Sequence, residues 1–168
     1  MNLMKNIKVE KITLNIGAGT DANKLDKGIK LIQSIAGKPP VKTFTTKRIP
    51  TWGIRPGLPI GCKLTLRKKP AVELLSRLLQ AKENKLATRQ FDNSGNLAFG
   101  IHEYIDIPGV KYDPTIGITG LEVCVTLERA GFRIKRRRVK NSKVSKKHAI
   151  TKEEAMEYLK NEFKVTVS

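Results

Sequence analysis

Residues 60–67 read Ile60-Gly61-Cys62-Lys63-Leu64-Thr65-Leu66-Arg67, so that apolar side chains alternate with cationic or hydroxyl-bearing ones. This period of two is typical of a β-strand that has one buried and one exposed face. The same kind of alternation occurs in residues 41–46, Val41-Lys42-Thr43-Phe44-Thr45-Thr46. The two segments predict strands whose exposed faces are basic and rich in hydrogen-bonding groups.

The sequence around these strands is strongly basic. From Lys27 to Val72 it contains no Asp or Glu but has eleven Lys and Arg residues. The whole chain has 33 basic and 15 acidic residues among 168, which gives a formal net charge of +18. Such a charge exceeds what solubility requires and makes nucleic acid the default partner. A membrane surface would need a basic amphipathic helix or a lipidation signal, and we find neither, so no membrane partner is expected.

Length and composition predict one compact domain. An apolar content of 39% over 168 residues is enough for a modest core. Cys62 and Cys124 each lie in an alternating apolar run without a second metal ligand nearby, which indicates reduced core thiols. The sequence lacks a signal-peptide core and an apolar run near the roughly 20 residues that span a bilayer. We therefore expect a cytoplasmic protein without a metal or cofactor.

The remaining periodicities predict helices between the strands. Asp21 is placed to cap a helix that ends at Gly37, and Pro70 suits the first turn of another helix. Within the first strand, the step at Glu10-Lys11 breaks the alternation as a β-bulge would. The expected strands are residues 7–16, 41–46, 60–67 and 121–127, and residues 97–107 are expected to add further extended structure.

A basic segment and a capped helix follow the last predicted strand. The segment contains Lys135-Arg136-Arg137-Arg138, and Thr151 and Glu154 form the capping box of the helix. The segment is compatible with a folded contact surface or with a disordered arm that orders on assembly. Together these elements predict a single α+β domain over residues 1–168. It would have a mainly antiparallel β-sheet, helices packed on one face, a long projecting basic loop, and a C-terminal basic segment plus helix.

Two short motifs raise the possibility of an enzyme. Gly17-x-Gly19-x-x-Ala22 lies between a strand and a helix, as a dinucleotide fingerprint would. That fingerprint requires a carboxylate after the second strand, where this sequence has no acidic residue. His102 and Glu103 are adjacent in an extended segment, so their side chains point to opposite faces, and no nucleophile accompanies them. We expect no catalytic site, and a nucleotide-dependent enzyme using residues 17–22 is the alternative.

The loop at residues 47–61 has the composition of a functional loop. It is long, its prolines limit its freedom, and it places cations beside Trp52. Guanidinium groups match phosphate oxygens in a bidentate way, so Arg48 and Arg55 are expected to contact phosphates. Trp52 is open to a second interpretation, in which it packs back onto the core.

The exposed strand faces form the main predicted binding surface. Their side chains can donate hydrogen bonds to phosphates and sugar hydroxyls, and a sheet reads RNA mostly through backbone and shape. Val41, Phe44 and Leu64 are expected on the opposite, buried face. An ordinary solvated sheet face is the alternative interpretation. The predicted binding residues are Asn15, Lys42, Thr43, Thr45, Lys63, Thr65 and Arg67.

Several motifs in a fixed order resemble one known family. They are Val9-Glu10-Lys11-Ile12-Thr13-Leu14-Asn15-Ile16-Gly17, Gly37-Lys38-Pro39-Pro40, the run from Ile54 to Arg67, Phe91-Asp92-x-x-Gly95-Asn96, and Gly100-Ile101-x-Glu103. In this order they are similar to family five of the large-subunit ribosomal proteins, the family that binds 5S rRNA. The similarity runs from the first strand to about Leu127.

The resemblance implies a non-enzymatic protein of the central protuberance. Such a protein anchors 5S rRNA beside the 23S-type rRNA and neighbouring ribosomal proteins, and reaches toward a protein of the small-subunit head. In the family, the loop matching residues 47–61 extends toward the elbow of peptidyl-site tRNA, which assigns Arg48, Trp52 and Arg55 to tRNA. The RNA-facing positions of the family map onto Asn15, Lys38 and Thr65. Lys38 departs from the Gln common in bacterial members and cannot supply an amide's paired donor and acceptor.

In two features the chain departs from the bacterial members and resembles the archaeal and eukaryotic branch of the family. The chain starts almost at its first strand, and it adds a basic segment and a helix after Gly131. The resemblance implies a family core over residues 1–129 and a basic extension over residues 130–168. A free-standing RNA chaperone with the same surface is a further alternative. The extension residues expected to contact rRNA or a neighbouring protein are Arg133, Lys135, Arg136, Arg137, Arg138, Lys146 and Lys147.

Overall fold

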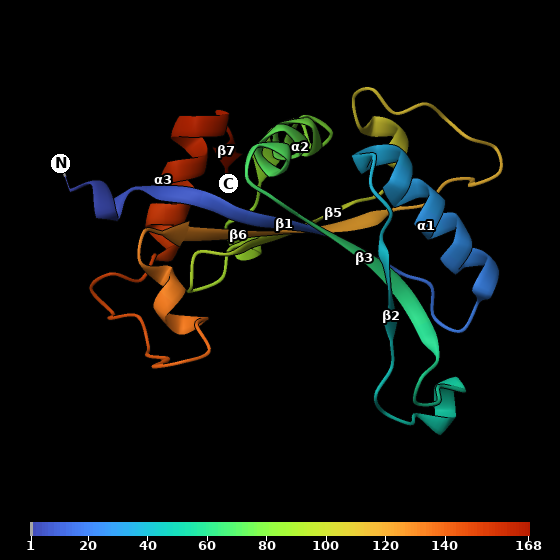
Figure 1. The fold of residues 1–168 in the computed structure, drawn as a ribbon. Coiled ribbons are helices and arrows are strands. Elements are labelled where there is room, and N and C mark those ends of the chain that lie inside the picture. The colour runs from blue at the N-terminus through green and yellow to red at the C-terminus, as the bar shows by residue number, and fades with distance from the viewer. Residues whose placement is uncertain (1) are drawn as a thin grey trace.

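A five-stranded antiparallel sheet organises the molecule (Figure 1). The computed structural model describes residues 2–168. The strand order is β2-β3-β1-β6-β5, so β1 lies at the centre with β3 and β6 as its neighbours. This arrangement confirms the predicted α+β fold. The strands of this sheet are β1 (Ile7–Gly17), β2 (Val41–Phe44), β3 (Pro59–Arg67), β5 (Leu97–Ile101) and β6 (Leu121–Arg129).

Helices α1 (Ala22–Ala36) and α2 (Lys69–Gln80) lie over one face of the sheet, and α3 (Lys152–Phe163) stands at its end near the start of β1 (Figure 1). Both predicted caps are confirmed. The Asp21 side chain accepts from the first amides of α1, and Gly37 ends that helix with a left-handed φ of 66°. Thr151 and Glu154 form the capping box of α3.

The apolar core lies between the sheet and the helices. Ile12 and Leu14 of β1 are completely buried, and they stand directly opposite Leu66 and Leu64 of β3. Because paired residues point to the same side, the register places all four under α1 and α2. Full burial of a side chain of this size contributes about 1.5–3 kcal/mol. Leu159 of α3 belongs to the same core, so the C-terminal helix is part of one folded unit.

The predicted bulge in β1 is confirmed. Pairing with β6 shifts between Val9 and Lys11, which leaves Glu10 as the extra residue. The side chain of Glu10 is turned away from the core and is nevertheless only 6% exposed, because arginine side chains cover it.

The edge strand β2 departs from the predicted alternation. Val41 pairs with Lys63, whereas Lys42 pairs with Cys62, so Lys42 lies on the helix side of the sheet. Val41 and Phe44 are 65% and 60% exposed. The prediction that Val41 and Phe44 are buried while Lys42 shares a face with Lys63 is therefore wrong. The reason is that α1 and α2 pack on β1 and β3, which leaves the edge strand uncovered.

Three further elements differ from the sequence prediction. The extended structure predicted over residues 97–107 ends at Ile101, and a 3-10 turn at Tyr104–Asp106 follows, with Tyr104 buried. Two short strands, β4 (Lys85–Leu86) and β7 (Thr166–Val167), form a separate parallel pair. A two-residue strand has no measurable period, so no sequence pattern announces it.

Candidate nucleic-acid interface

The sheet face opposite the helices carries polar side chains in a fixed register. We call this surface, formed by β1, β3 and β6, the open face. Antiparallel pairing places directly opposed side chains next to each other on the same side. The structure thus brings four predicted residues, Asn15, Lys63, Thr65 and Arg67, onto one surface. The pairs across β1 and β3 are Lys11 with Arg67, Thr13 with Thr65, and Asn15 with Lys63.

Hydrogen bonds on the open face join β1 to both neighbouring strands. The hydroxyl oxygens of Thr13 and Thr65 lie 3.4 Å apart, and Asn15 Nδ2 donates to Glu122 Oε2 over 3.2 Å. A carboxylate only accepts, so it fixes the Asn15 amide nitrogen and leaves Asn15 Oδ1 for another donor. Donors and acceptors together suit ribose hydroxyls and base edges better than cations alone. Sequence reasoning missed Glu122, whose pairing with Asn15 appears only when β6 joins β1.

Cys124 also lies on the open face, opposite Thr13. It is half-buried, so its predicted place in the core is wrong, although both cysteines are free thiols as expected. Burial raises the pKa of the Cys124 thiol, and the nearby Glu122 carboxylate raises it further. Burial likewise raises the pKa of the Cys62 thiol. Both thiols are thus held neutral, which disfavours nucleophilic chemistry.

The predicted residues near β2 fall into different environments. Thr43 of β2 lies opposite Gly61, on the same side of the sheet as the open face, whereas Thr45 uses its hydroxyl locally, donating to the Lys47 carbonyl over 2.8 Å. Lys38 is exposed in the turn between α1 and β2. A Cβ at Gly61 would lie only 2.6 Å from the carbonyl oxygen of Ile16, so glycine permits the close approach of β1 and β3 there.

Residues 45–58 form an ordered hairpin that projects beyond the sheet (Figure 1). Backbone hydrogen bonds in both directions join Ile49 and Ile54, at 3.0 and 3.1 Å, below a 3-10 turn at Pro50–Trp52. Trp52 is 69% exposed, which rules out the interpretation that it packs onto the core. Arg48 and Arg55 are also exposed on this projecting hairpin.

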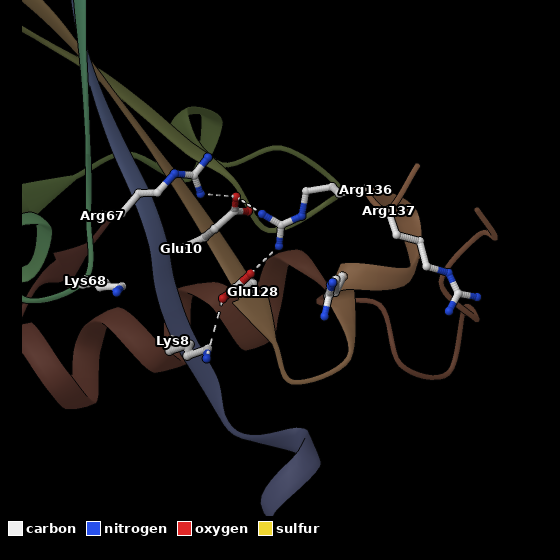
Figure 2. Close-up of a pocket in the computed structure, with 8 residues that line it drawn as sticks. Lys8, Glu10, Arg67, Lys68, Glu128, Arg136 and Arg137 are labelled. Carbon is white, nitrogen blue, oxygen red and sulfur yellow. Dashed lines mark hydrogen bonds and ion pairs between the residues drawn. The ribbon is translucent and has the colours of Figure 1, made fainter. Parts of the chain in front are cut away.

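A pocket of about 620 Å³ lies where the C-terminal segment, the chain between β6 and α3, meets the open face (Figure 2). We call it the basic pocket. Its wall combines side chains of β1, β3 and β6 with arginines that follow the last strand of the sheet. Six of the lining residues are cationic and two are carboxylates. They are Lys8, Glu10, Arg67, Lys68, Glu128, Arg133, Arg136 and Arg137.

Ion pairs occupy the centre of the basic pocket. Glu10 accepts from Arg67 Nη1 over 2.8 Å and also from Arg136, which in turn donates to Glu128. Lys8 Nζ lies 3.6 Å from the second oxygen of Glu128. Figure 2 shows this chain of interactions crossing from β3 to the C-terminal segment. Arg136, predicted to contact rRNA or a neighbouring protein, thus fastens the segment to the sheet.

Arg129 anchors the same segment from the core side. This residue is 5% exposed and donates to the carbonyl oxygens of Lys5, His148 and Ala149, and over 2.7 Å to Glu154 Oε1. These acceptors come from the turn before β1, the turn before α3 and α3 itself, so one guanidinium ties the chain's beginning to its C-terminal part.

The C-terminal segment between β6 and α3 is thus folded against the sheet. Phe132 is buried, with Lys135 Nζ 4.7 Å from its ring centroid. His148 Nε2 lies 2.9 Å from the carbonyl oxygen of Ala130. These contacts favour the folded interpretation of the segment over the disordered arm. The other predicted contact residues of the segment, Arg138, Lys146 and Lys147, are exposed.

The glycine turn after β1 is not built to hold a phosphate. The amides of Ala18 and Gly19 both donate to the Ile60 carbonyl, and Asp21 occupies the first amides of α1. A dinucleotide site needs these donors for its own pyrophosphate. Within residues 2–168, no cluster of three His, Cys, Asp or Glu side chains could hold a metal ion. Nor does any helix in that part of the chain combine the length and apolar character that crossing a bilayer requires.

Comparisons with known proteins cover both the sheet and its C-terminal segment. The family model for ribosomal protein L5 matches residues 2–55, and the model for the C-terminus of the same ribosomal family matches residues 59–158. The large ribosomal subunit protein uL5 of Methanosphaera stadtmanae is 46% identical over 167 residues, covering 99% of each chain. Its namesake in Nanoarchaeum equitans is 48% identical over 165 residues, covering 98% of this chain and 97% of the relative. The uL5 protein of Sulfurisphaera tokodaii is 45% identical over 168 residues, covering 99% and 95%.

Proposed function

This chain belongs to the ribosomal protein L5 family, whose members are structural, non-enzymatic constituents of the large ribosomal subunit, and we propose that it binds 5S rRNA through the open face. In this role it works in the cytoplasmic ribosome, within the central protuberance. It lies there beside the large-subunit rRNA and neighbouring ribosomal proteins.

The paired polar rows of β1 and β3 carry this proposal. Thr13, Thr65 and Asn15 offer hydroxyl and amide groups in fixed positions, and Lys63 and Arg67 add positive charge beside them. RNA duplexes expose ribose hydroxyls and phosphates in a wide, shallow groove, which a flat surface with such groups can follow. The cations supply affinity and the neutral groups supply register.

The projecting hairpin supports a second contact, with peptidyl-site tRNA. Arg48, Trp52 and Arg55 are all exposed on it, and the Ile49–Ile54 backbone pair keeps their positions defined. An aromatic ring and guanidinium groups bind RNA by stacking and by bidentate phosphate contacts. The same location in the subunit also brings the protein close to a protein of the small-subunit head.

Salt dependence of 5S rRNA binding tests the main proposal. If about six phosphates are neutralised, the slope of log K against log salt should be roughly −4 to −5. Filter binding of a 5S rRNA transcript over a salt series measures this slope, with an unrelated RNA of equal length as the control. A flat response, or equal affinity for both RNAs, would contradict a specific 5S site.

Two alternatives give different outcomes. A free-standing RNA chaperone would leave large subunits in a high-salt gradient, whereas a subunit constituent should stay with them. A nucleotide-dependent enzyme would bind a dinucleotide stoichiometrically. We expect no such binding, because the turn amides of Ala18 and Gly19 are already engaged by Ile60.

A further inference from the structure

Lys68 has a backbone conformation that residues with side chains avoid. Its φ is 61° and its ψ is −146°, a region populated essentially by glycine. The residue precedes α2, and its side chain makes no capping hydrogen bond with that helix. Its carbonyl oxygen accepts the first backbone hydrogen bonds of α2, from the amides of Ala71 and Val72, so the start of the helix holds the residue in this conformation. Residues with strained backbone angles cluster at functional sites, which makes the Lys68 side chain a candidate for a binding role.

The side chain of Lys68 lines the basic pocket (Figure 2). Both carboxylates of the pocket are already engaged, Glu10 by Arg67 and Arg136, and Glu128 by Arg136 and Lys8. Within residues 2–168, no carboxylate lies at ion-pair distance from Lys68, Arg133 or Arg137. The pocket thus has an excess of positive charge that the protein itself does not neutralise.

The uncompensated cations flank the ion-paired centre. Figure 2 shows Lys68 on one side of the Arg67–Glu10–Arg136 group and Arg137 on the other. Glu10 and Glu128 hold the central guanidinium groups in place, so the positive wall is formed before any ligand arrives. A ligand that neutralises cations on both sides must carry several negative charges along its length. The repeated phosphates of a nucleic-acid backbone have this property.

We propose that the basic pocket binds the sugar–phosphate backbone of RNA and that Lys68 is a phosphate contact retained despite its strained backbone. The proposal rests on the proposed RNA-binding function and extends the RNA surface from the open face to the C-terminal segment. In this site Lys68, Arg133 and Arg137 meet phosphate oxygens. Arg136 positions the segment through Glu10 and Glu128 and contributes indirectly.

The variant Lys68→Gly separates stability from binding. Glycine relieves the strained φ, so the melting temperature should rise by about 2–4 °C. Loss of one phosphate contact should weaken 5S rRNA binding by about 5- to 10-fold and make the salt slope shallower by about 1. Lys164→Gly is the matched control. Lys164 is exposed and has a φ of 52°, so this variant removes the same charge from a positive-φ position outside the pocket.

Inorganic tripolyphosphate gives a readout that does not need 5S rRNA. At constant ionic strength it should raise the melting temperatures of the wild type and of Lys164→Gly. The melting temperature of Lys68→Gly should rise much less. Equal RNA affinity and slope in the wild type and Lys68→Gly would overturn the proposal, as would equal losses in Lys68→Gly and Lys164→Gly. Stabilisation by tripolyphosphate with unchanged RNA binding would identify a small-anion site and also overturn it. A wild type that ignores 5S rRNA refutes the proposed function, while the tripolyphosphate result still reports on the pocket.

Discussion

The side-chain amide of Asn15 on β1 donates a hydrogen bond to the carboxylate of Glu122 on β6, 107 residues further along the chain. The bond engages the amide nitrogen of Asn15 and leaves its Oδ1 as a hydrogen-bond acceptor on the open face. The Glu122 carboxylate also places a negative charge on a surface that we propose binds RNA. A carboxylate at such a position disfavours phosphate and favours groups that donate hydrogen bonds, such as ribose hydroxyls and base amino groups.

Substituting the two members of this pair should have different effects on RNA binding. Asn15→Ala, like Thr65→Ala, should weaken 5S rRNA binding by about 1 kcal/mol, the scale of one hydrogen bond. Glu122→Ala should instead increase affinity for an unrelated RNA, because it removes a repulsive charge, and should lower the preference for 5S rRNA. Parallel filter-binding titrations with both RNAs measure the ratio. An unchanged ratio in Glu122→Ala would show that Glu122 takes no part in recognition.

The projecting hairpin should be separable from the open face. The double variant Trp52→Ala, Arg55→Ala should fold normally and bind 5S rRNA nearly as well as the wild type, since both side chains are exposed on the hairpin. Retention of peptidyl-site tRNA on reconstituted ribosomes should decrease. Lost 5S rRNA binding in this variant would mean that the two contacts are not divided in this way.

Among the ionic residues, Arg129 should contribute most to stability. Arg129→Ala removes a buried guanidinium and leaves three carbonyl oxygens and Glu154 without this donor, and should lower the free energy of unfolding by about 3 kcal/mol. Urea denaturation measures the change. Arg138→Ala, at an exposed position of the same segment, should stay within about 0.5 kcal/mol of the wild type. Similar losses in both variants would contradict the anchoring role of Arg129.

Glu154 should make stability depend on pH in the acid range. The backbone amide of Thr151 lowers the pKa of the Glu154 carboxyl, and Arg129 lowers it further, against an opposing effect of burial. A carboxyl with a lowered folded-state pKa stabilises the protein above its unfolded-state pKa, and this stability is lost as pH falls through the folded-state pKa. The stability difference between the wild type and Glu154→Gln should thus shrink between about pH 5 and about pH 3.

Other carboxyls do not confound that comparison. Hydrogen bonds from backbone amides also lower the pKa values of Glu153 and Asp113. These groups titrate in both proteins, so their effect cancels in the difference. A difference that grows on acidification would contradict the assigned role of Glu154.

Gly61 should tolerate no side chain. A Cβ there would lie 2.6 Å from a backbone oxygen of β1, so Gly61→Ala should destabilise the fold by about 2 kcal/mol through strand displacement. Gly100→Ala on β5 is the control, because a Cβ at that position has no neighbour within 4 Å. Thermal unfolding of both variants checks the contrast, and equal stabilities would show that β1 and β3 can move apart.

The sequence predicted the central strands well because each has one face against the core. Residues 60–67 and the bulge at Glu10 behaved as their periodicity indicated. Val41 and Phe44 did not, because an edge strand is not covered by helices and its apolar residues are no guide to the buried side. Periodicity reports burial, so it fails where burial is absent.

The candidate site was only partly predictable for a different reason. Asn15 and Thr65 lie in well-patterned strands, so their common face could be inferred. Glu10 meets Arg136 across 126 residues, and no local pattern joins them. Lys68 gives no signal in the sequence at all, because its unusual backbone angles appear only in the folded chain.

The central place of β1 has a consequence for biosynthesis. This strand is made first, yet one of its two partners, β6, begins only at Leu121. Until that segment has been translated, one edge of β1 has unpaired amide and carbonyl groups beside apolar side chains. Pairings between distant segments form slowly, and exposed strand edges promote aggregation. We therefore expect the nascent chain to depend on chaperone protection until its last third has emerged.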